Sequence, residues 1–226
     1  MVNLIFLGPP GSGKGTQAKI ISNKMSLPII STGDILREEI IKKSDVGLKA
    51  AVFVDSGKLV PDEVVISMIE RRISTSDYSD GFIMDGFPRN SIQAEKLDHM
   101  LVAIGKKIDS VLELKIDSEI LVQRMVARFT CGNCGEIYNK LFKKTKKDNI
   151  CDICNSSDFV YRKDDNEQVV RSRQQVYNDT SEDLVEFYLT KGLIYKLDAS
   201  KSSGFITEKI LNYFLKIDLV NDNNNN

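Results

Sequence analysis

The chain has 226 residues, of which 42% are hydrophobic and 28% charged, and its 31 basic and 32 acidic side chains give a formal net charge of -1. This composition allows a packed core and excludes a largely disordered chain. The near-neutral charge excludes attraction of the whole molecule to nucleic acid or to an anionic membrane, so any anion site has to be local.

Short apolar runs alternate along the chain with helical periodicity, which predicts parallel strands joined by helices in a three-layer α/β core. We expect five strands, at residues 4–7, 27–30, 82–84, 111–116 and 193–197. Helical patterns are expected at residues 17–25, 35–43, 118–129 and 205–217. Residues 219–226, rich in asparagine, are expected to form a disordered tail.

The sharpest motif is the run Gly-Pro-Pro-Gly-Ser-Gly-Lys-Gly-Thr at residues 8–16, between the first predicted strand and the first predicted helix. Glycines let backbone N–H groups converge on a phosphate, the helix N-terminus points there, and Lys14 neutralises phosphate oxygens. The motif predicts a triphosphate site. Gly15 stands before Thr16, so a direct Thr16 contact to magnesium stays open and the ion is expected to keep mostly water ligands.

The Gly-Lys-Gly-Thr form resembles nucleoside monophosphate kinases, and further motifs resemble the adenylate kinase family in order along the chain. These are residues 30–37 (Ile-Ser-Thr-Gly-Asp-Ile-Leu-Arg), 55–62 (Asp-Ser-Gly-Lys-Leu-Val-Pro-Asp), 84–89 (Met-Asp-Gly-Phe-Pro-Arg) with Gln93, 162–165 (Arg-Lys-Asp-Asp) and 170–173 (Val-Arg-Ser-Arg). Independently of the resemblance, a helix beginning after Ser31 or Thr32 offers capped N–H groups, and Arg37 offers the planar fork that suits a phosphate.

The resemblance implies two nucleotide sites. The implied ATP site comprises Gly11, Ser12, Gly13, Lys14, Gly15, Thr16, Arg124, Arg128, Ile137, Tyr138 and the backbone of Lys201. The implied AMP site comprises Thr32, Arg37, Lys58, Leu59, Val60, Gly86, Phe87, Pro88, Arg89, Gln93, Arg162 and Arg173. Lys14, Arg89, Arg124, Arg128, Arg162 and Arg173 are implied as the catalytic cations around the transferred phosphoryl group.

Further roles follow from the same resemblance. Asp85 is implied to hold Mg²⁺ through water, and Asp164 and Asp165 are implied as hinge partners of a lid and not as general bases. The implied activity is reversible, Mg²⁺-dependent transfer of the ATP terminal phosphoryl group to AMP, giving two ADP and serving nucleotide homeostasis. A monomer is implied. The expected division is a core at 1–30, 61–126 and 166–218, an AMP-binding insert at 31–60 and a lid at 127–165.

Four cysteines form two Cys-x-x-Cys pairs, and sixteen residues separate the pairs. The cysteines are Cys131, Cys134, Cys151 and Cys154. Four thiolates at this spacing make a closed tetrahedral site, which is structural, and zinc is the expected ion, with iron left open. Paired cysteines that serve as ligands, together with the lack of an apolar run long enough for a signal peptide or membrane span, predict the cytoplasm.

Two features leave functional alternatives open. Asn90 follows Arg89 as in pyrimidine monophosphate kinases, so another nucleoside monophosphate could be the acceptor. Lysines near the cysteines suggest a nucleic-acid-binding zinc ribbon, although aspartates dilute them. They are Lys140, Lys143, Lys144, Lys146 and Lys147. His99, the single histidine, is interpreted as structural or exposed.

Overall fold

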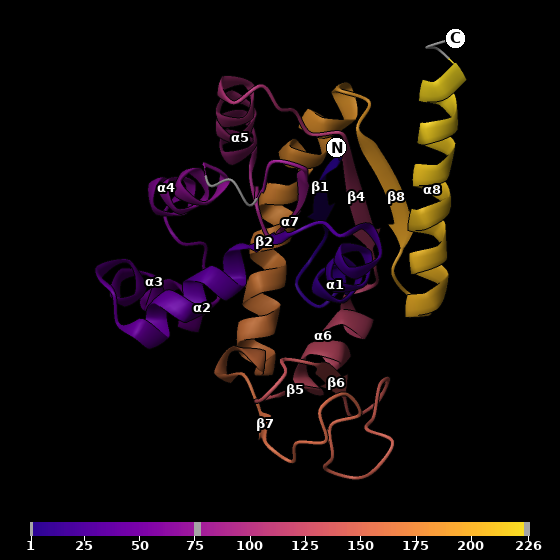
Figure 1. The fold of residues 1–226 in the computed structure, drawn as a ribbon. Coiled ribbons are helices and arrows are strands. Elements are labelled where there is room, and N and C mark those ends of the chain that lie inside the picture. Colours follow the sequence, from indigo (N-terminus) through magenta and orange to yellow (C-terminus); the bar gives the residue numbers. More distant parts are fainter. Residues whose placement is uncertain (1, 75–77, 224–226) are drawn as a thin grey trace.

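The computed structural model describes residues 2–74 and 78–223, and a parallel sheet lies at its centre (Figure 1). The strands are β1 Val2–Leu7, β2 Ile29–Ser31, β3 Gly81–Asp85, β4 Ser110–Lys115 and β8 Ile194–Asp198. Their order is β2-β3-β1-β4-β8, and neighbouring strands pair in parallel. The predicted α/β class with a five-stranded parallel sheet is confirmed.

The central strand β1 is apolar because both of its faces are buried. Ile5 and Leu7 belong to one hydrophobic cluster, and Leu4 and Phe6 belong to another on the opposite face. Side chains alternate along a strand, so a strand covered on both sides has to be apolar throughout. Asn3 is the polar exception, and its amide donates to the Lys107 carbonyl at 2.7 Å.

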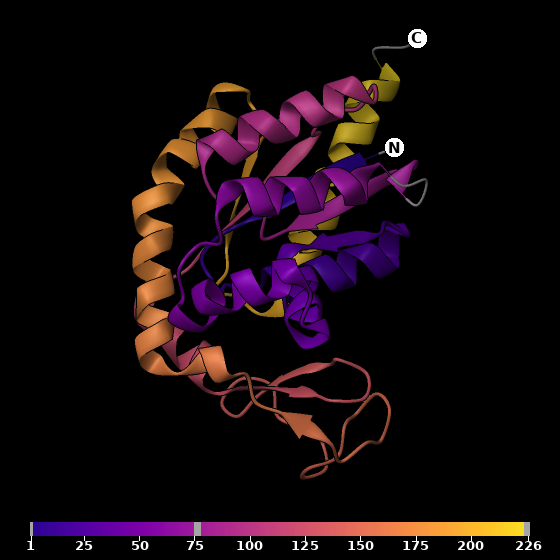
Figure 2. The same ribbon diagram turned by 90° about the vertical axis from the view of Figure 1, so that its left-hand side faces the viewer.

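Helices cover both faces of the sheet (Figures 1 and 2). On one face, α1 Lys14–Met25 and α8 Ser203–Asn223 contribute Ile21 and Ile210 to the cluster around Leu4. The opposite face is covered by α4 Asp62–Ile73, α5 Ser91–Ala103 and α7 Glu167–Thr190. Amphipathic helices on each side therefore complete a three-layer core.

Two helices, α2 Thr32–Lys42 and α3 Asp45–Ser56, lie beside the sheet within the predicted 31–60 insert (Figure 1). The Ser31 hydroxyl caps α2 by accepting from the Asp34 amide at 3.3 Å. A Cβ added to Gly47 would lie 2.0 Å from the Glu39 carbonyl oxygen, so this helix crossing requires glycine.

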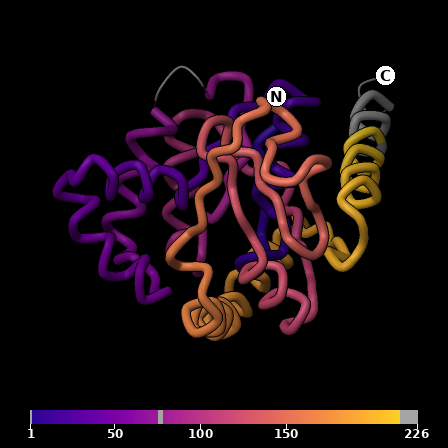
Figure 3. Tube along the Cα trace, turned by 90° about the horizontal axis from the view of Figure 1, so that it is seen from below, coloured from indigo at the N-terminus to yellow at the C-terminus, as the bar shows by residue number. Residues whose placement is uncertain are grey.

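The segment predicted to be the lid contains a small antiparallel sheet and projects away from the core (Figure 2). Its strands are β5 Arg128–Cys131, β6 Ile137–Asn139 and β7 Phe159–Val160, in the order β6-β5-β7. Seen from below, the segment lies in front of the core, with α2 and α3 to one side and α8 to the other (Figure 3). Its aromatic and cysteine side chains form a separate small cluster.

Helix α6, Ser118–Val126, ends before the predicted boundary at residue 129. Arg128 therefore lies on strand β5, and the predicted helical face shared by Arg124 and Arg128 is wrong. Phe129 likewise leaves the predicted apolar row of the helix, because its ring packs at 5.2 Å from that of Phe159 in the small sheet. Cross-strand aromatic packing has overridden the helical periodicity.

Helix α8 also differs from its predicted length. It continues to Asn223, into the segment predicted to be disordered, and residues 224–226 lie outside the described part of the chain. Extending a formed helix costs little per residue compared with nucleating one. No described helix has the length and apolar character to cross a membrane.

Replacement of Leu97 by alanine tests the core beneath α5. Leu97 is fully buried, so we expect the free energy of unfolding of Leu97→Ala to fall by about 2–5 kcal/mol, because a cavity remains. Val102→Ala on the same helix is the control, since Val102 is 72% exposed, and should change stability by about 0.5 kcal/mol or less. Urea denaturation measures both; equal losses would contradict this packing.

Candidate active site

A cavity of about 830 Å³ lies at the carboxyl ends of the central strands, between the core and the small sheet. Its floor is the loop after β1 and the first turn of α1, and its walls include residues of α6, β6 and α7. Ligands of parallel α/β sheets bind at this edge, because the loops that follow the strands converge there.

The glycine-rich loop is held close to α6. Gly11 has φ +85°, and a Cβ there would lie 2.6 Å from side-chain carbons of Leu121 and Met125. Gly13 has φ +100° and precedes Lys14, the first residue of α1. Glycine is required at Gly11 both by its dihedral angle and by the neighbouring helix.

The Lys14 ammonium lies inside the loop. It donates to the carbonyl oxygens of Gly8 at 2.5 Å and Pro9 at 2.8 Å. Burial lowers the pKa of Lys14 to about 8; Asp85 opposes this shift and the nearby Arg89 adds to it. A buried ammonium beside other cations is stabilised by an anion, so the loop is suited to phosphate.

Asp85 ends β3 and lines the same cavity as Lys14. Burial raises the pKa of Asp85, and the Lys14 charge opposes that rise. A Cβ at Gly15 would lie 3.2 Å from Asp85 Oδ2, tighter than an ordinary contact. The glycine after the loop lysine therefore makes room for this carboxylate.

Arginines converge on the same cavity from several parts of the chain. They are Arg37, Arg89, Arg124, Arg128, Arg162 and Arg173. Burial, with the nearby Arg173, lowers the pKa of Arg89 to about 10, and burial, with the nearby Arg128, does the same for Arg162. Desolvated guanidiniums that repel one another mark the position for a multiply charged anion.

Two aspartates form ion pairs with arginines where the small sheet joins the core. Asp165 accepts from both Nε, at 2.7 Å, and Nη2 of Arg128. Asp164 accepts from Arg173 at 2.6 Å. Both aspartates lie in a short 3-10 helix, Lys163–Asp165, where the chain returns to the core. Both carboxylates are engaged in ion pairs, and their role as hinge partners of the lid stays a prediction.

A smaller cavity of about 60 Å³ adjoins the first, beside α2 and α5. Arg37, Arg89 and Arg173 line both cavities, so a guanidinium cluster lies at their junction. The Thr32 hydroxyl donates to the Gly86 carbonyl at 2.9 Å on one wall, and Gln93 lies on another.

The predicted site residues divide between these cavities. Those on the larger cavity are Gly11, Ser12, Gly13, Lys14, Gly15, Thr16, Pro88, Arg124, Arg128, Ile137, Tyr138, Arg162 and Lys201. Those on the smaller are Thr32, Lys58, Val60 and Gln93, and those on both are Arg37, Leu59, Gly86, Arg89 and Arg173. Phe87, predicted as an AMP contact, lines neither and packs in the core.

Tyr138 reaches the cavity, but its hydroxyl faces into the small sheet. The side chain is 1% exposed, and its ring stacks on Phe129 at 5.6 Å. The hydroxyl accepts from the Asp152 amide at 2.7 Å and lies 3.3 Å from Cys151 Sγ. The hydroxyl of Tyr138 thus contacts the cysteine cluster. The predicted role of Tyr138 in nucleotide binding did not include this contact.

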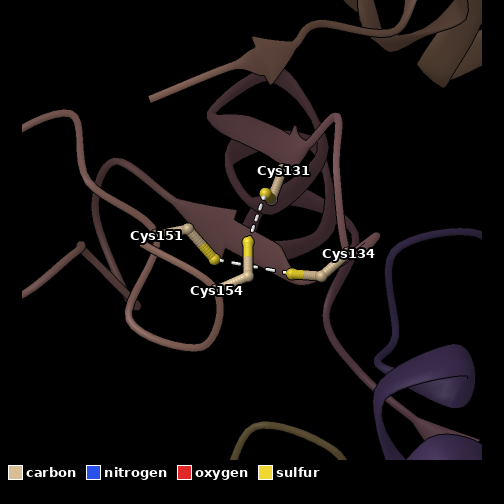
Figure 4. A group of neighbouring side chains, drawn as sticks. All are labelled: Cys131, Cys134, Cys151 and Cys154. Atoms are coloured by element: carbon tan, nitrogen blue, oxygen red, sulfur yellow. Dashed lines mark hydrogen bonds between the residues drawn. The ribbon is translucent and has the colours of Figure 1, made fainter. Parts of the chain in front are cut away.

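The four cysteines converge at one end of the small sheet (Figure 4). Their sulfurs all lie within 4.8 Å of one another, and Cys131–Cys154 and Cys134–Cys151 are each 3.5 Å apart. Four sulfurs around a tetrahedral ion with bonds of about 2.3 Å lie about 3.8 Å apart, so this cluster fits a metal ion.

Sequence reasoning missed residues whose roles depend on tertiary contacts. Lys19 donates to the Gly135 carbonyl at 2.9 Å and so joins α1 to the first cysteine turn. Arg124 lies 5.6 Å from the centre of the Phe142 ring. Asp62 accepts from Gln93 at 2.6 Å. Lys19 and Phe142 belong to no motif in the sequence. Asp62 is the last residue of the 55–62 motif, but no role was predicted for it.

The fold and the loop define a P-loop nucleotide-binding protein of the α/β class. Its residues 6–193 match the family model described as adenylate kinase. Similar curated proteins are the adenylate kinases of Archaeoglobus fulgidus, 48% identical over 92% of this chain and 96% of the relative, and of Geotalea daltonii, 44% identical over 93% and 98%. The adenylate kinase of Clostridium tetani is 42% identical over 93% and 97%. The chain belongs to the adenylate kinase family and is a phosphotransferase.

The lowered pKa of Lys14 predicts a stability that depends on pH. Its pKa is about 8 when folded and 10.5 in the unfolded reference, so the unfolded chain binds more protons between these values and stability rises with pH there. Urea denaturation of wild type and Lys14→Met should show wild type gaining about 2 kcal/mol relative to the variant between pH 7 and 9.5. A constant difference would contradict the depressed pKa.

Proposed function

We propose that the enzyme transfers the terminal phosphoryl group of ATP reversibly to AMP, giving two ADP. The supporting observation is the pair of adjoining cavities that share Arg37, Arg89 and Arg173. The larger cavity contains the phosphate-binding loop and suits the triphosphate. The smaller contains Gln93 and suits the base of a monophosphate, so the two phosphate chains meet at the shared arginines.

Catalysis at this junction is positioning and charge stabilisation. Lys14 holds the donor phosphates, while Arg89 and Arg173 hold the acceptor phosphate in line with them. Charge that develops on the transferred group is met by guanidiniums already fixed in place. Arg162 and Arg128 line the cavity on the side of the lid. The closed lid excludes water from the site and so suppresses ATP hydrolysis.

Mg²⁺ is the implied cofactor of the donor nucleotide. The Asp85 carboxylate lines the cavity beside Lys14, and Thr16 lines it as well, so hard oxygen ligands that suit this ion are present. Asp85 would hold the ion through its water ligands. When bound, Mg²⁺ neutralises charge on the triphosphate.

Zinc is the proposed occupant of the cysteine cluster. Four sulfur ligands leave no position for substrate, so the ion would fix the fold of the lid without entering the reaction. Cys131 and Cys151 are buried, and Tyr138 and Phe129 pack beside them. The ion and this small aromatic cluster together replace the larger core that so short a segment lacks.

Two alternatives are less well supported. Asn90 lines neither cavity, and its side chain caps α5 by accepting from the Gln93 backbone N–H at 2.8 Å, which favours Gln93 as the residue that meets the base. Among the lid lysines, Lys143 pairs with Glu136 and lines the nucleotide cavity. That placement favours a nucleotide lid over a nucleic-acid surface. Adenine nucleotide balance by a cytoplasmic monomer is the proposed physiological role.

The reaction is tested by ADP formation from ATP with AMP, CMP, UMP or GMP as acceptor. We expect AMP to be preferred, and Arg89→Ala to lower kcat by about 10²–10³-fold, because a fixed donor to the transition state is lost. Arg71→Ala on the exposed end of α4 is the charge-matched control and should retain activity. Preference for a pyrimidine nucleotide, or nucleic-acid binding without transfer, would overturn the proposal.

The metal is tested by elemental analysis of the purified protein. We expect about one zinc per chain and its loss in Cys134→Ser, with Tm lower by roughly 5–10 °C, because the lid loses its cross-link. Asp148→Ala, in the exposed part of the same segment, should keep both zinc and Tm. Iron in place of zinc would correct the identity of the ion, and a metal-free protein with unchanged Tm would refute the site.

A further inference from the structure

The side-chain amide of Gln93 is held from two directions. Its Oε1 accepts from the backbone N–H of Arg89 at 2.8 Å, and its Nε2 donates to Asp62 Oδ1 at 2.6 Å. Gln93 is 1% exposed and lines the smaller cavity. The amide therefore faces the proposed base site with its oxygen and nitrogen each already assigned to one partner.

Asp62 lies behind this amide and lines neither cavity. It is the first residue of α4, where the helix dipole favours a carboxylate. The Asn90 side chain donates to both of its oxygens, at 3.2 and 3.1 Å. Asn90 also accepts from the Gln93 backbone N–H, so Asp62, Asn90 and Gln93 form one closed set of hydrogen bonds.

These partners permit one orientation of the Gln93 amide. A carboxylate can only accept hydrogen bonds, and a backbone N–H can only donate. Rotating the amide by half a turn would place its oxygen against Asp62 and its NH₂ group against the Arg89 N–H. Both contacts would then be repulsive, and buried groups would be left unpaired.

In this fixed orientation, one N–H of Gln93 Nε2 remains free to donate to the base, and one lone pair of Oε1 remains free to accept from it. The edge of adenine offers an amino group that donates and a ring nitrogen that accepts, which complements this pair. A purine with a 6-oxo group offers an acceptor and an N–H donor in those places, which opposes it. Such a mismatch leaves buried polar groups unpaired, the kind of difference by which sites discriminate strongly.

We propose that Asp62 is a specificity-determining positioning residue, which locks the Gln93 amide in the orientation that accepts 6-aminopurine and rejects 6-oxopurine monophosphates. The inference rests on the proposed function, because it assigns the smaller cavity to the base of the acceptor. Asp62 acts through Gln93 and does not touch the nucleotide.

Asp62→Asn tests the lock with little change of shape, because an asparagine can accept from or donate to Gln93 and so permits both orientations. With saturating ATP, kcat and KM are measured for AMP and for inosine monophosphate, which differs from AMP at the 6-position and the adjacent ring nitrogen. We expect the ratio of the two kcat/KM values to fall by about tenfold, carried mainly by KM. The Arg89 N–H persists and keeps the loss partial.

Glu63→Gln is the matched control, since it removes an exposed acidic charge from the same turn of α4 and should leave the ratio unchanged. Asp62→Ala is the second variant should the asparagine variant fold poorly, and it should lower the ratio as well. General loosening of α4 would lower kcat/KM for both nucleotides alike and leave their ratio unchanged. An unchanged ratio in active variants therefore overturns the role of Asp62 and leaves the proposed function standing. Wild type that accepts both nucleotides equally also overturns it. Wild type inactive with every monophosphate overturns the proposed function, and the lock with it.

Discussion

The site depends on holding partly desolvated cations close together at one edge of the sheet. Burial lowers the pKa of Lys14, Arg89 and Arg173; the charges of Arg89 and Arg173 lower that of Lys14 further, and the charge of Arg173 lowers that of Arg89. Such an arrangement lowers the stability of the fold, and the core has to offset it. The parallel sheet does so because it is packed on both faces and its loops converge at one edge, where the loop carbonyls of Gly8 and Pro9 hold the Lys14 ammonium.

The same electrostatic constraint joins the lid to the core. The lid leaves the core between α6 and β5 and returns through the 3-10 helix that carries Asp164 and Asp165. Asp165 holds Arg128 of the lid strand, and Asp164 holds Arg173 of α7. In the proposed reaction an incoming phosphate would compete for these two guanidiniums, so we expect its binding to change the contacts where the lid joins the core. The proposed function therefore predicts coupling between nucleotide binding and lid position through these two ion pairs.

The sequence predicted those features that local chemistry determines. The five strands follow from apolar runs, the loop around Lys14 from its glycines, and the cysteine cluster from its spacing. The end of α6 could not be predicted, because Phe129 fits a helical row as well as it fits the aromatic cluster in which it lies. The hydroxyl of Tyr138 and the carboxylate of Asp62 acquire partners only when distant segments meet. Periodicity and motif spacing record no such contacts.

The division between two cavities separates affinity from selectivity. All nucleoside monophosphates carry the same phosphate charge, so the cations at the junction cannot tell one base from another. Selectivity has to come from a few polar atoms near the base, and a glutamine amide is a poor discriminator by itself, because its last torsion is broad and roughly two-fold. A second layer of residues removes this two-fold ambiguity when one of its groups accepts from the amide nitrogen and another donates to the amide oxygen. Asp62 and the Arg89 N–H supply that layer, and the proposed function thereby gives Arg89 two tasks: its guanidinium would bind phosphate, while its backbone N–H orients the side-chain amide of Gln93.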